Sequence, residues 1–310
     1  MQMNKIIIVM MIFLLCSCGR NHVSDDFFAM DTYMQIISLN TAENCSEVKK
    51  LVFAEDKKLR RDNINLNDAE IISIVKRACR ISEKTDGAFD ITVAPLCDIW
   101  GFWDKNFRVP TEKETAEALR KTGYDKIFFS DEGVILPAGF SLDFGAVAKG
   151  YTGDLIRDML AEKGTKNALI SLGGNVVALG TKDGRNPWSI GIKNPFGDGY
   201  AGYVEVTDKS VVTSGGYERF FQSNGIKYSH IINPKTGKPA DSDIASVTVI
   251  SSDGFLADAL STAFYVLGSK KSETLITSSD CTVDGSEFSV VMILNDKSIK
   301  TFGNVTYKNA

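Results

Sequence analysis

Helical and strand-like segments follow one another along this chain without a regular alternation. Helices are expected at residues 44–61, 67–81, 112–121, 148–163 and 254–267, and strands at 27–40, 126–130, 133–136, 167–212, 245–251 and 288–294. A doubly wound parallel sheet needs strands and helices in strict succession, which is missing here. The order therefore predicts an α+β fold built on a mixed sheet.

The composition is that of a folded protein and excludes several classes. The 310 residues are 44% hydrophobic and 24% charged, with a net charge of −4, which excludes intrinsic disorder. An acidic balance argues against general nucleic-acid binding, which needs a basic surface. With two histidines in all, a multi-histidine zinc site is excluded. No Pro/Ser-rich linker divides residues 27–310, so we expect one compact unit, with two lobes as the alternative.

Residues 1–17 have the features of an export signal. Lys5 precedes an apolar run from Ile6 to Leu15, which as a helix would cover about 15 Å, half of a bilayer's hydrocarbon core. The sequence Leu-Cys-Ser-Cys that ends at Cys18 resembles the bacterial lipobox, in which this cysteine is lipidated after cleavage. We expect an exported lipoprotein on the bacterial cell membrane, facing the periplasm or the exterior, with residues 18–26 as its tether. An ordinary secretory signal is the alternative.

Two glycine-containing segments have residue types that suit a ligand with a ring and a phosphate. In the first, Gly87 precedes Ala88, Phe89 and Asp90, so a ligand could approach the backbone closely. A loop packed on tryptophans would explain the same residues. The second segment, 141–151, contains Asp143, Ala146 and Lys149 and leads into a helix, whose first N–H groups favour an anion. A plain strand-to-helix turn is the alternative, and the segment matches neither the P-loop nor the dinucleotide-binding fingerprint.

Two further segments contain groups suited to catalysis or metal binding. His230 is the sole histidine of residues 27–310, and its ordinary role would be a structural hydrogen bond. Asp258 and Thr262 are four residues apart on an otherwise small and apolar helix, so they share one face. Carboxylate and hydroxyl oxygens are hard donors that suit Mg²⁺. The alternative pairs Asp258 with a basic residue and bonds Thr262 back to its own helix.

Seven short motifs, taken together and in this order, resemble those of the ApbE-type FAD:protein FMN transferases. The motifs are T-x-G-x-F-D at 85–90, L-D-F-G-A-V-A-K-G-Y at 142–151, S-L-G-G-N at 171–175, W-S-I-G-I at 188–192, T-S-G at 213–215, H-I-I-N-P-K-T-G at 230–237 and A-D-A-L-S-T-A at 257–263. One departure is Asp31, which stands where the family commonly has glycine. Members of the family are often exported lipoproteins, in agreement with the lipobox at Cys18.

The resemblance implies a fold with FAD in a central cleft and Mg²⁺ beside it. It implies that Mg²⁺ is held by Asp258, by the hydroxyl of Thr262 and by the backbone carbonyl of Ala146. Flavin contacts are implied at Met30, Ala88, Phe89, Asp90, Asp143, Lys149 and His230. The implied catalytic residues are Asp258 and His230, the latter as the base that accepts the proton of the acceptor hydroxyl.

The implied reaction transfers FMN from FAD to a threonine or serine hydroxyl of an acceptor protein and releases AMP. By resemblance, the acceptor is a flavoprotein with a short Ser/Thr-containing motif, such as a subunit of a membrane electron-transport complex. Two alternatives remain at this stage. One is an FAD pyrophosphatase that forms free FMN and AMP, and the other is a non-enzymatic lipoprotein that binds FAD.

Overall fold

The computed structural model describes residues 23–278 and 285–310. The expected signal at 1–17, the lipidated Cys18 and the first part of the tether lie outside these ranges, so their assignment stays a prediction. Within the described ranges, no helix is both long and apolar enough to cross a membrane.

Seven α-helices and one 3-10 turn lie in the described ranges. They are α1 (Ala42–Leu59), α2 (Ala69–Lys84), α3 (Ala94–Trp100), α4 (Glu112–Leu119), η1 (Tyr124–Lys126), α5 (Ala148–Glu162), α6 (Gly254–Leu267) and α7 (Ser269–Thr277). The strands are β1 (Val23–Ala29), β2 (Thr32–Leu39), β3 (Phe128–Ser130), β4 (Gly133–Ile135), β5 (Ala168–Leu172), β6 (Asn175–Leu179), β7 (Trp188–Lys193), β8 (Tyr200–Val206), β9 (Lys209–Gly215), β10 (Phe220–Ser223), β11 (Ile226–Ser229), β12 (Ile232–Asn233), β13 (Lys238–Pro239), β14 (Ile244–Ser251), β15 (Phe288–Leu294), β16 (Ile299–Phe302) and β17 (Tyr307–Asn309).

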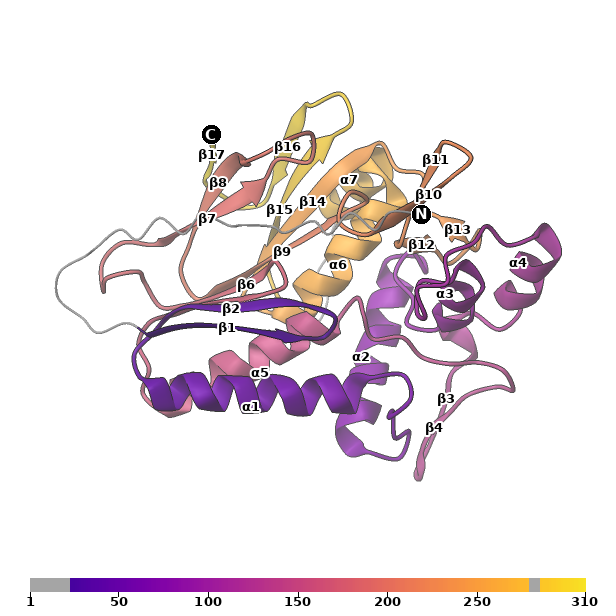
Figure 1. Ribbon diagram of the computed structural model, residues 1–310, viewed down its shortest axis with the longest axis horizontal. Coiled ribbons are helices and arrows are strands. Elements are labelled where there is room, and N and C mark those ends of the chain that lie inside the picture. The colour runs from indigo at the N-terminus through magenta and orange to yellow at the C-terminus, as the bar shows by residue number, and fades with distance from the viewer. Residues whose placement is uncertain (1–22, 279–284) are drawn as a thin grey trace.

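An eight-stranded sheet forms the centre of the molecule, in the order β1-β2-β5-β6-β9-β14-β15-β16 (Figure 1). Every neighbouring pair in it is antiparallel. The α+β prediction is therefore confirmed, while the expected mixed sheet is wrong in detail, because no pair within this sheet is parallel. Antiparallel neighbours need only short connections, which explains why no helix follows most strands.

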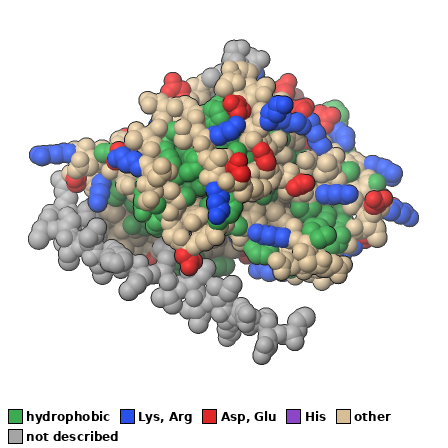
Figure 2. Space-filling view, turned by 90° about the horizontal axis from the view of Figure 1, so that it is seen from above, with side chains coloured by type: hydrophobic (Ala, Val, Ile, Leu, Met, Phe, Trp, Pro, Cys, Tyr) green, Lys and Arg blue, Asp and Glu red, His purple; other side chains and the backbone are tan. Residues whose placement is uncertain are grey.

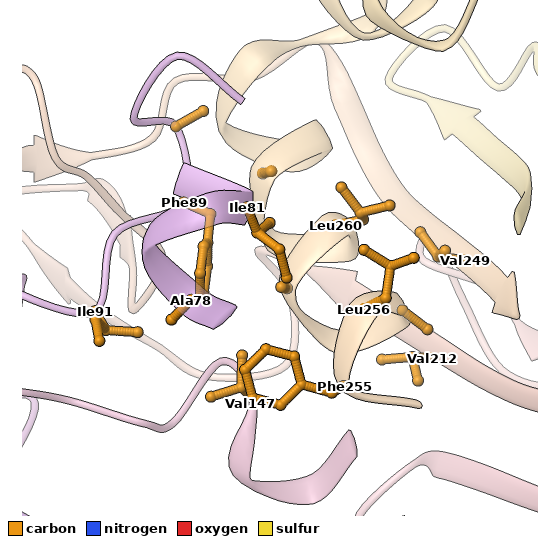
Figure 3. Close-up of a cluster of buried hydrophobic side chains, with 14 of the residues drawn as sticks. Ala78, Ile81, Phe89, Ile91, Val147, Val212, Val249, Phe255, Leu256 and Leu260 are labelled. Carbon is orange, nitrogen blue, oxygen red and sulfur yellow. The ribbon is translucent and has the colours of Figure 1, made fainter. Parts of the chain in front are cut away.

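Helices cover one face of the large sheet, and a second sheet covers the other. Side chains of α2, α5 and α6 share a buried cluster with β9, β14 and β15, and α1 packs with α5 on β2 and β5. The three-stranded sheet β17-β8-β7 packs its apolar side chains on the opposite face. Figure 3 shows part of the first cluster, with Phe89, Ile91, Val147, Phe255, Leu256 and Leu260.

The N-terminal segment differs from the sequence-based expectation. The stretch expected as one strand is the hairpin β1–β2, turned by Met30 and Asp31, whose φ angles of 48° and 56° are left-handed. Aspartate adopts left-handed backbone more readily than most residues, because its short polar side chain can hydrogen-bond locally, so Asp31 is compatible with this turn. Strand β1 begins at Val23, so residues 23–26, assigned to the tether from the sequence, belong to the sheet.

Candidate functional site

Two glycines bring helices α5 and α6 into direct backbone contact. A Cβ at Gly150 would lie 2.1 Å from the carbonyl oxygen of Gly254, and a Cβ at Gly254 would lie 2.7 Å from that of Gly150. The Asp154 carboxylate on α5 accepts the N–H groups of Gly254 and Phe255, at 2.8 and 2.9 Å. A carboxylate at a helix N-terminus is stabilising, so this contact fixes the start of α6 against α5.

One turn further along α6, Asp258 lies against the first turn of α5. Its side chain is 4% exposed, and its Oδ2 accepts the N–H of Gly150 at 2.9 Å. Among the described residues no ion pair joins Asp258 to a base, and the half-buried Thr262 hydroxyl makes no hydrogen bond. Neither structural alternative considered from the sequence therefore occurs among the described residues: Asp258 has no basic partner, and the Thr262 hydroxyl does not bond back to its own helix.

This pair fits a hard divalent cation. A buried carboxylate with no basic partner is costly unless a cation or further donors compensate it. Ala146, whose carbonyl the resemblance adds to the site, lies in the turn just before α5, one helical turn from Gly150. No cluster of three or more His, Cys, Asp or Glu side chains with metal-binding geometry occurs in the described ranges. A site here would thus combine one carboxylate with a hydroxyl and a backbone carbonyl, as Mg²⁺ accepts alongside water.

The N-terminus of α5 has less room for an anion than the sequence suggested. The N–H of Ala148 donates to the Phe144 carbonyl at 2.7 Å, and that of Gly150 is taken by Asp258. The Lys149 ammonium is partly exposed, and its one hydrogen bond within the described part of the chain is a 3.4 Å contact with the Gly145 carbonyl. Positive charge for a phosphate would therefore come mainly from this lysine.

His230 is half-buried and has a defined tautomer. Both its backbone N–H and its Nδ1 lie near the carbonyl oxygen of Arg219, at 3.1 and 3.0 Å. A carbonyl only accepts hydrogen bonds, so Nδ1 carries the proton and Nε2 has the free lone pair. Burial lowers the pKa of His230 to about 4, with the charges of Arg219 and Lys149 adding to the effect. The imidazole is therefore neutral at physiological pH and can accept a proton at Nε2.

Arg219 links His230 to the turn that contains Met30. Its guanidinium donates to the Asp31 carbonyl at 3.0 Å, and the Met30 N–H donates to the Asp56 carboxylate at 3.0 Å. Glu218, the preceding residue, is exposed and interacts electrostatically with Lys149, Lys193, Arg219 and Asp258. The structure thus brings together the neighbourhoods of Met30, Lys149, His230 and Asp258.

Glu218 and Arg219 were not predicted as site residues from the sequence. They follow the T-S-G motif at 213–215 after only two residues, and this proximity is the signal that could have singled them out. Single charges in a loop have no periodicity, so their position beside Lys149 and His230 depends on tertiary structure.

The segment at 88–90 has mostly structural contacts. Ala88 and Phe89 are 3% and 1% exposed and belong to the core. The Asp90 carboxylate accepts the Thr92 N–H and hydroxyl and the Tyr124 N–H, at 2.8, 2.7 and 2.9 Å, and burial raises its pKa. Flavin contact through these side chains is not apparent, and contact through their backbone stays a prediction.

Asp143 is tied to the same region. Its N–H donates to the Ile91 carbonyl at 2.7 Å, and its carboxylate accepts the Gly145 N–H at 2.7 Å. It therefore shapes the turn before α5.

Two surface hollows in the described ranges, one beside α2 and η1 and one between α3 and α4, include neither Lys149 nor His230 nor Asp258. The flavin cleft implied by resemblance is neither of them.

The architecture and motifs define a known family. The model of the ApbE family matches residues 23–284, and the chain belongs to that family. It is similar to the FAD:protein FMN transferase of Treponema pallidum, with 38% identity over 228 residues that cover 67% of this chain and 63% of that protein. The chain thus spans less than two thirds of the length of this curated relative.

Solved structures agree over nearly the whole chain. The crystal structure of the ApbE protein from Thermotoga maritima has a TM-score of 0.81 and 33% identity, covering 90% of this chain and 96% of that one. The flavin transferase ApbE from Vibrio cholerae has a TM-score of 0.77 and 25% identity, covering 92% and 97%. The resemblance stated from the motifs is confirmed.

Proposed function

We propose that this protein is an FAD:protein FMN transferase, which moves FMN from FAD to a serine or threonine hydroxyl of an acceptor protein and releases AMP. The observation that carries the proposal is the buried Asp258, which faces the start of α5 one turn from the Thr262 hydroxyl; among residues 23–278 and 285–310, Asp258 has no basic partner and this hydroxyl no hydrogen bond. Such a pair suits a metal-assisted reaction at a pyrophosphate. The names of its relatives support the same activity.

In the proposed reaction the acceptor oxygen attacks the phosphorus on the FMN side of FAD. The bond between this phosphorus and the bridging oxygen of the pyrophosphate breaks, and AMP leaves with the bridging oxygen. His230 Nε2 accepts the proton of the attacking hydroxyl, since Nδ1 already donates to Arg219. Lys149 lies close enough to interact with His230 and supplies positive charge near the pyrophosphate.

Mg²⁺, when bound, would act as a Lewis acid that offsets charge on the pyrophosphate oxygens. Asp258, the Thr262 hydroxyl and the Ala146 carbonyl would hold it. Asp258 has a second task in the chain itself, because its bond to the Gly150 N–H keeps α5 in register with α6.

The proposal extends to the location of the protein. We propose that Cys18 is lipidated after removal of residues 1–17 and that the enzyme works on the outer side of a bacterial cell membrane, through a lipid anchor. The acceptor would then be an extracytoplasmic flavoprotein, such as a subunit of a membrane electron-transport complex.

Nucleic acid is not an expected partner. Figure 2 agrees, because basic and acidic side chains are interspersed on the face that it displays.

The test uses the full chain, purified in detergent, with FAD, MgCl₂ and extracytoplasmic flavoproteins prepared without flavin. Intact-mass spectrometry of the acceptor should show the gain of one FMN. The matched variants are Asp258→Asn, which keeps the shape but removes the charge, and Asp253→Asn at the N-cap of α6, outside the metal ligands. Transfer should be lost in Asp258→Asn and kept in Asp253→Asn. No acceptor gaining mass, with FAD intact under every metal condition, would contradict the proposal.

A further inference from the structure

The hairpin formed by β10 and β11 begins and ends at the candidate site. Arg219 precedes β10 and His230 follows β11, and the backbone bond between them closes the base of the hairpin at 3.1 Å. In Figure 1 the hairpin stands out from the body beside β12 and β13. An acceptor whose hydroxyl reaches His230 therefore comes close to the base of this hairpin.

One face of the hairpin is held rigidly by aromatic side chains. Phe221 and Tyr228 are opposite each other, with ring centroids 5.1 Å apart and nearly parallel. Tyr228 packs on Trp100 at 5.3 Å, and Phe221 stacks on Phe107 at 5.4 Å. The indole N–H of Trp100 donates to the Gly237 carbonyl at 2.8 Å. This support fixes the position of the hairpin without using its edges.

The outer edge of β10 has unused backbone groups. β10 and β11 pair only with each other in the described ranges. Because the pair Arg219 and His230 is hydrogen-bonded, the alternation of an antiparallel ladder turns the N–H groups of Phe220 and Gln222 outward. No other backbone bond to these two residues occurs among the described residues.

The two edges differ in exposure only at the base of the hairpin, beside the candidate site, since Ile226 and Lys227 on β11 are exposed as well. Residues 218–220 are all exposed, so the edge of β10 is open down to the site. Phe220 is 43% exposed, with the Lys227 ammonium over one face of its ring at 4.0 Å. Strand β11 instead ends at the buried Ser229. An open strand edge with an exposed aromatic is what a protein offers to an extended peptide that adds a strand.

We infer that the Ser/Thr-containing segment of the acceptor docks in extended form along the outer edge of β10, pairing with Phe220 and Gln222. The added strand directs its hydroxyl toward His230 at the base of the hairpin. The inference rests on the proposed transfer reaction and adds the place and the conformation in which the acceptor binds.

The test exploits the opposed pair Gln222 and Lys227, whose N–H groups point outward from opposite edges. Gln222→Pro removes the outward N–H on β10, and Lys227→Pro makes the same change on β11. Because the Lys227 ammonium lies 4.0 Å from the centroid of the Phe220 ring, Lys227→Ala is compared alongside to separate the loss of this cation from the loss of the N–H. Proline is tolerated at such edge positions. With the full chain, FAD and the acceptor modified by the wild type, Gln222→Pro should raise KM for the acceptor about tenfold, as expected for one lost hydrogen bond. KM for FAD should not change in either variant.

A second variant, Phe220→Ser, keeps the backbone and should also raise the acceptor KM. FAD affinity, measured by flavin fluorescence, reports whether each variant is folded. An acceptor KM unchanged in Gln222→Pro and in Phe220→Ser, with transfer intact, would overturn the docking inference alone. Lack of transfer by the wild type would overturn the proposed function instead. If Gln222→Pro abolished a dimer and left KM unchanged, the edge would serve self-association and the inference would be wrong.

Discussion

Replacing Gly150 with alanine tests the packing that positions the candidate metal site. The added Cβ would lie 2.1 Å from the Gly254 carbonyl oxygen, whereas real Cβ contacts under 3.0 Å essentially never occur. The helices α5 and α6 must therefore separate by about 0.9 Å, and the obstacle is backbone, which cannot rotate away.

The magnitude follows from three contributions. Overpacking costs about 1–3 kcal/mol, and weakening the Gly150 N–H bond to buried Asp258 costs about 1–2 kcal/mol more. Alanine regains about 1 kcal/mol in helix propensity. We expect a net loss of about 2 kcal/mol in the free energy of unfolding. Because Asp258 moves with α6, Mg²⁺ affinity should also fall, by about tenfold or more.

Urea denaturation gives the stability change, and calorimetric titration with MgCl₂ gives the affinity. Gly153→Ala is the matched control on the same helix, since its Cβ would meet the Cγ2 methyl of Val177 at 2.8 Å, whereas the Cβ at Gly150 would meet backbone and Asp258. The control should lose about 1–2 kcal/mol from the overlap with Val177 but keep the Mg²⁺ affinity of the wild type, because Asp258 is not displaced. A Gly150→Ala protein as stable as wild type, with unchanged Mg²⁺ affinity, would refute the reasoning.

Three further predictions concern the side chains of the site. In a His22→Gln chain, NMR titration of His230 should give a pKa of about 4, below its ordinary 6.5. Because the unfolded chain takes up a proton at His230 at a higher pH than the folded chain does, the free energy of unfolding should be unaffected by this group above pH 6.5 and should fall as the pH drops from 6.5 to about 4. An ordinary pKa for His230 would contradict the argument from burial. Thr262→Val should lower Mg²⁺ affinity about tenfold in calorimetry without lowering stability, because its hydroxyl makes no hydrogen bond to any residue that the structure describes; a simple loss of stability would assign it a structural role. Arg219→Ala should raise KM for FAD in steady-state kinetics by loosening the Asp31 turn, with partial rescue by Arg219→Lys, and an unchanged KM would exclude this link.

Elements with strong local signals were predictable from the sequence. Helix α6 has the expected bounds, 254–267, because an N-capping aspartate and a terminal glycine enclose an apolar run. Strand β15 likewise matches 288–294. Helix α3 was missed, since it is short and lies within an aromatic loop, and α7 was missed as well.

The candidate site was predictable only in part. The spacing of Asp258 and Thr262 placed both on one helical face, and the structure adds that Gly150 and Gly254 bring α5 against it. The packing of Phe89 could not be read from the sequence, because its buried cluster combines segments far apart in the chain, such as α2 and α6. Two of the Asp90 bonds are local, to Thr92, but the third goes to Tyr124, 34 residues away. The low pKa of His230 depends on burial, which a sequence does not specify for a single histidine.

The central claim is that FMN is transferred to a protein hydroxyl, and the stoichiometry of products tests it most directly. Free AMP, free FMN and flavinylated acceptor should be measured in one reaction of the full chain with FAD, MgCl₂ and acceptor. We predict one AMP for each flavinylated acceptor, with little free FMN. Equal amounts of AMP and free FMN, with the acceptor unmodified, would contradict transfer and identify the protein as an FAD pyrophosphatase.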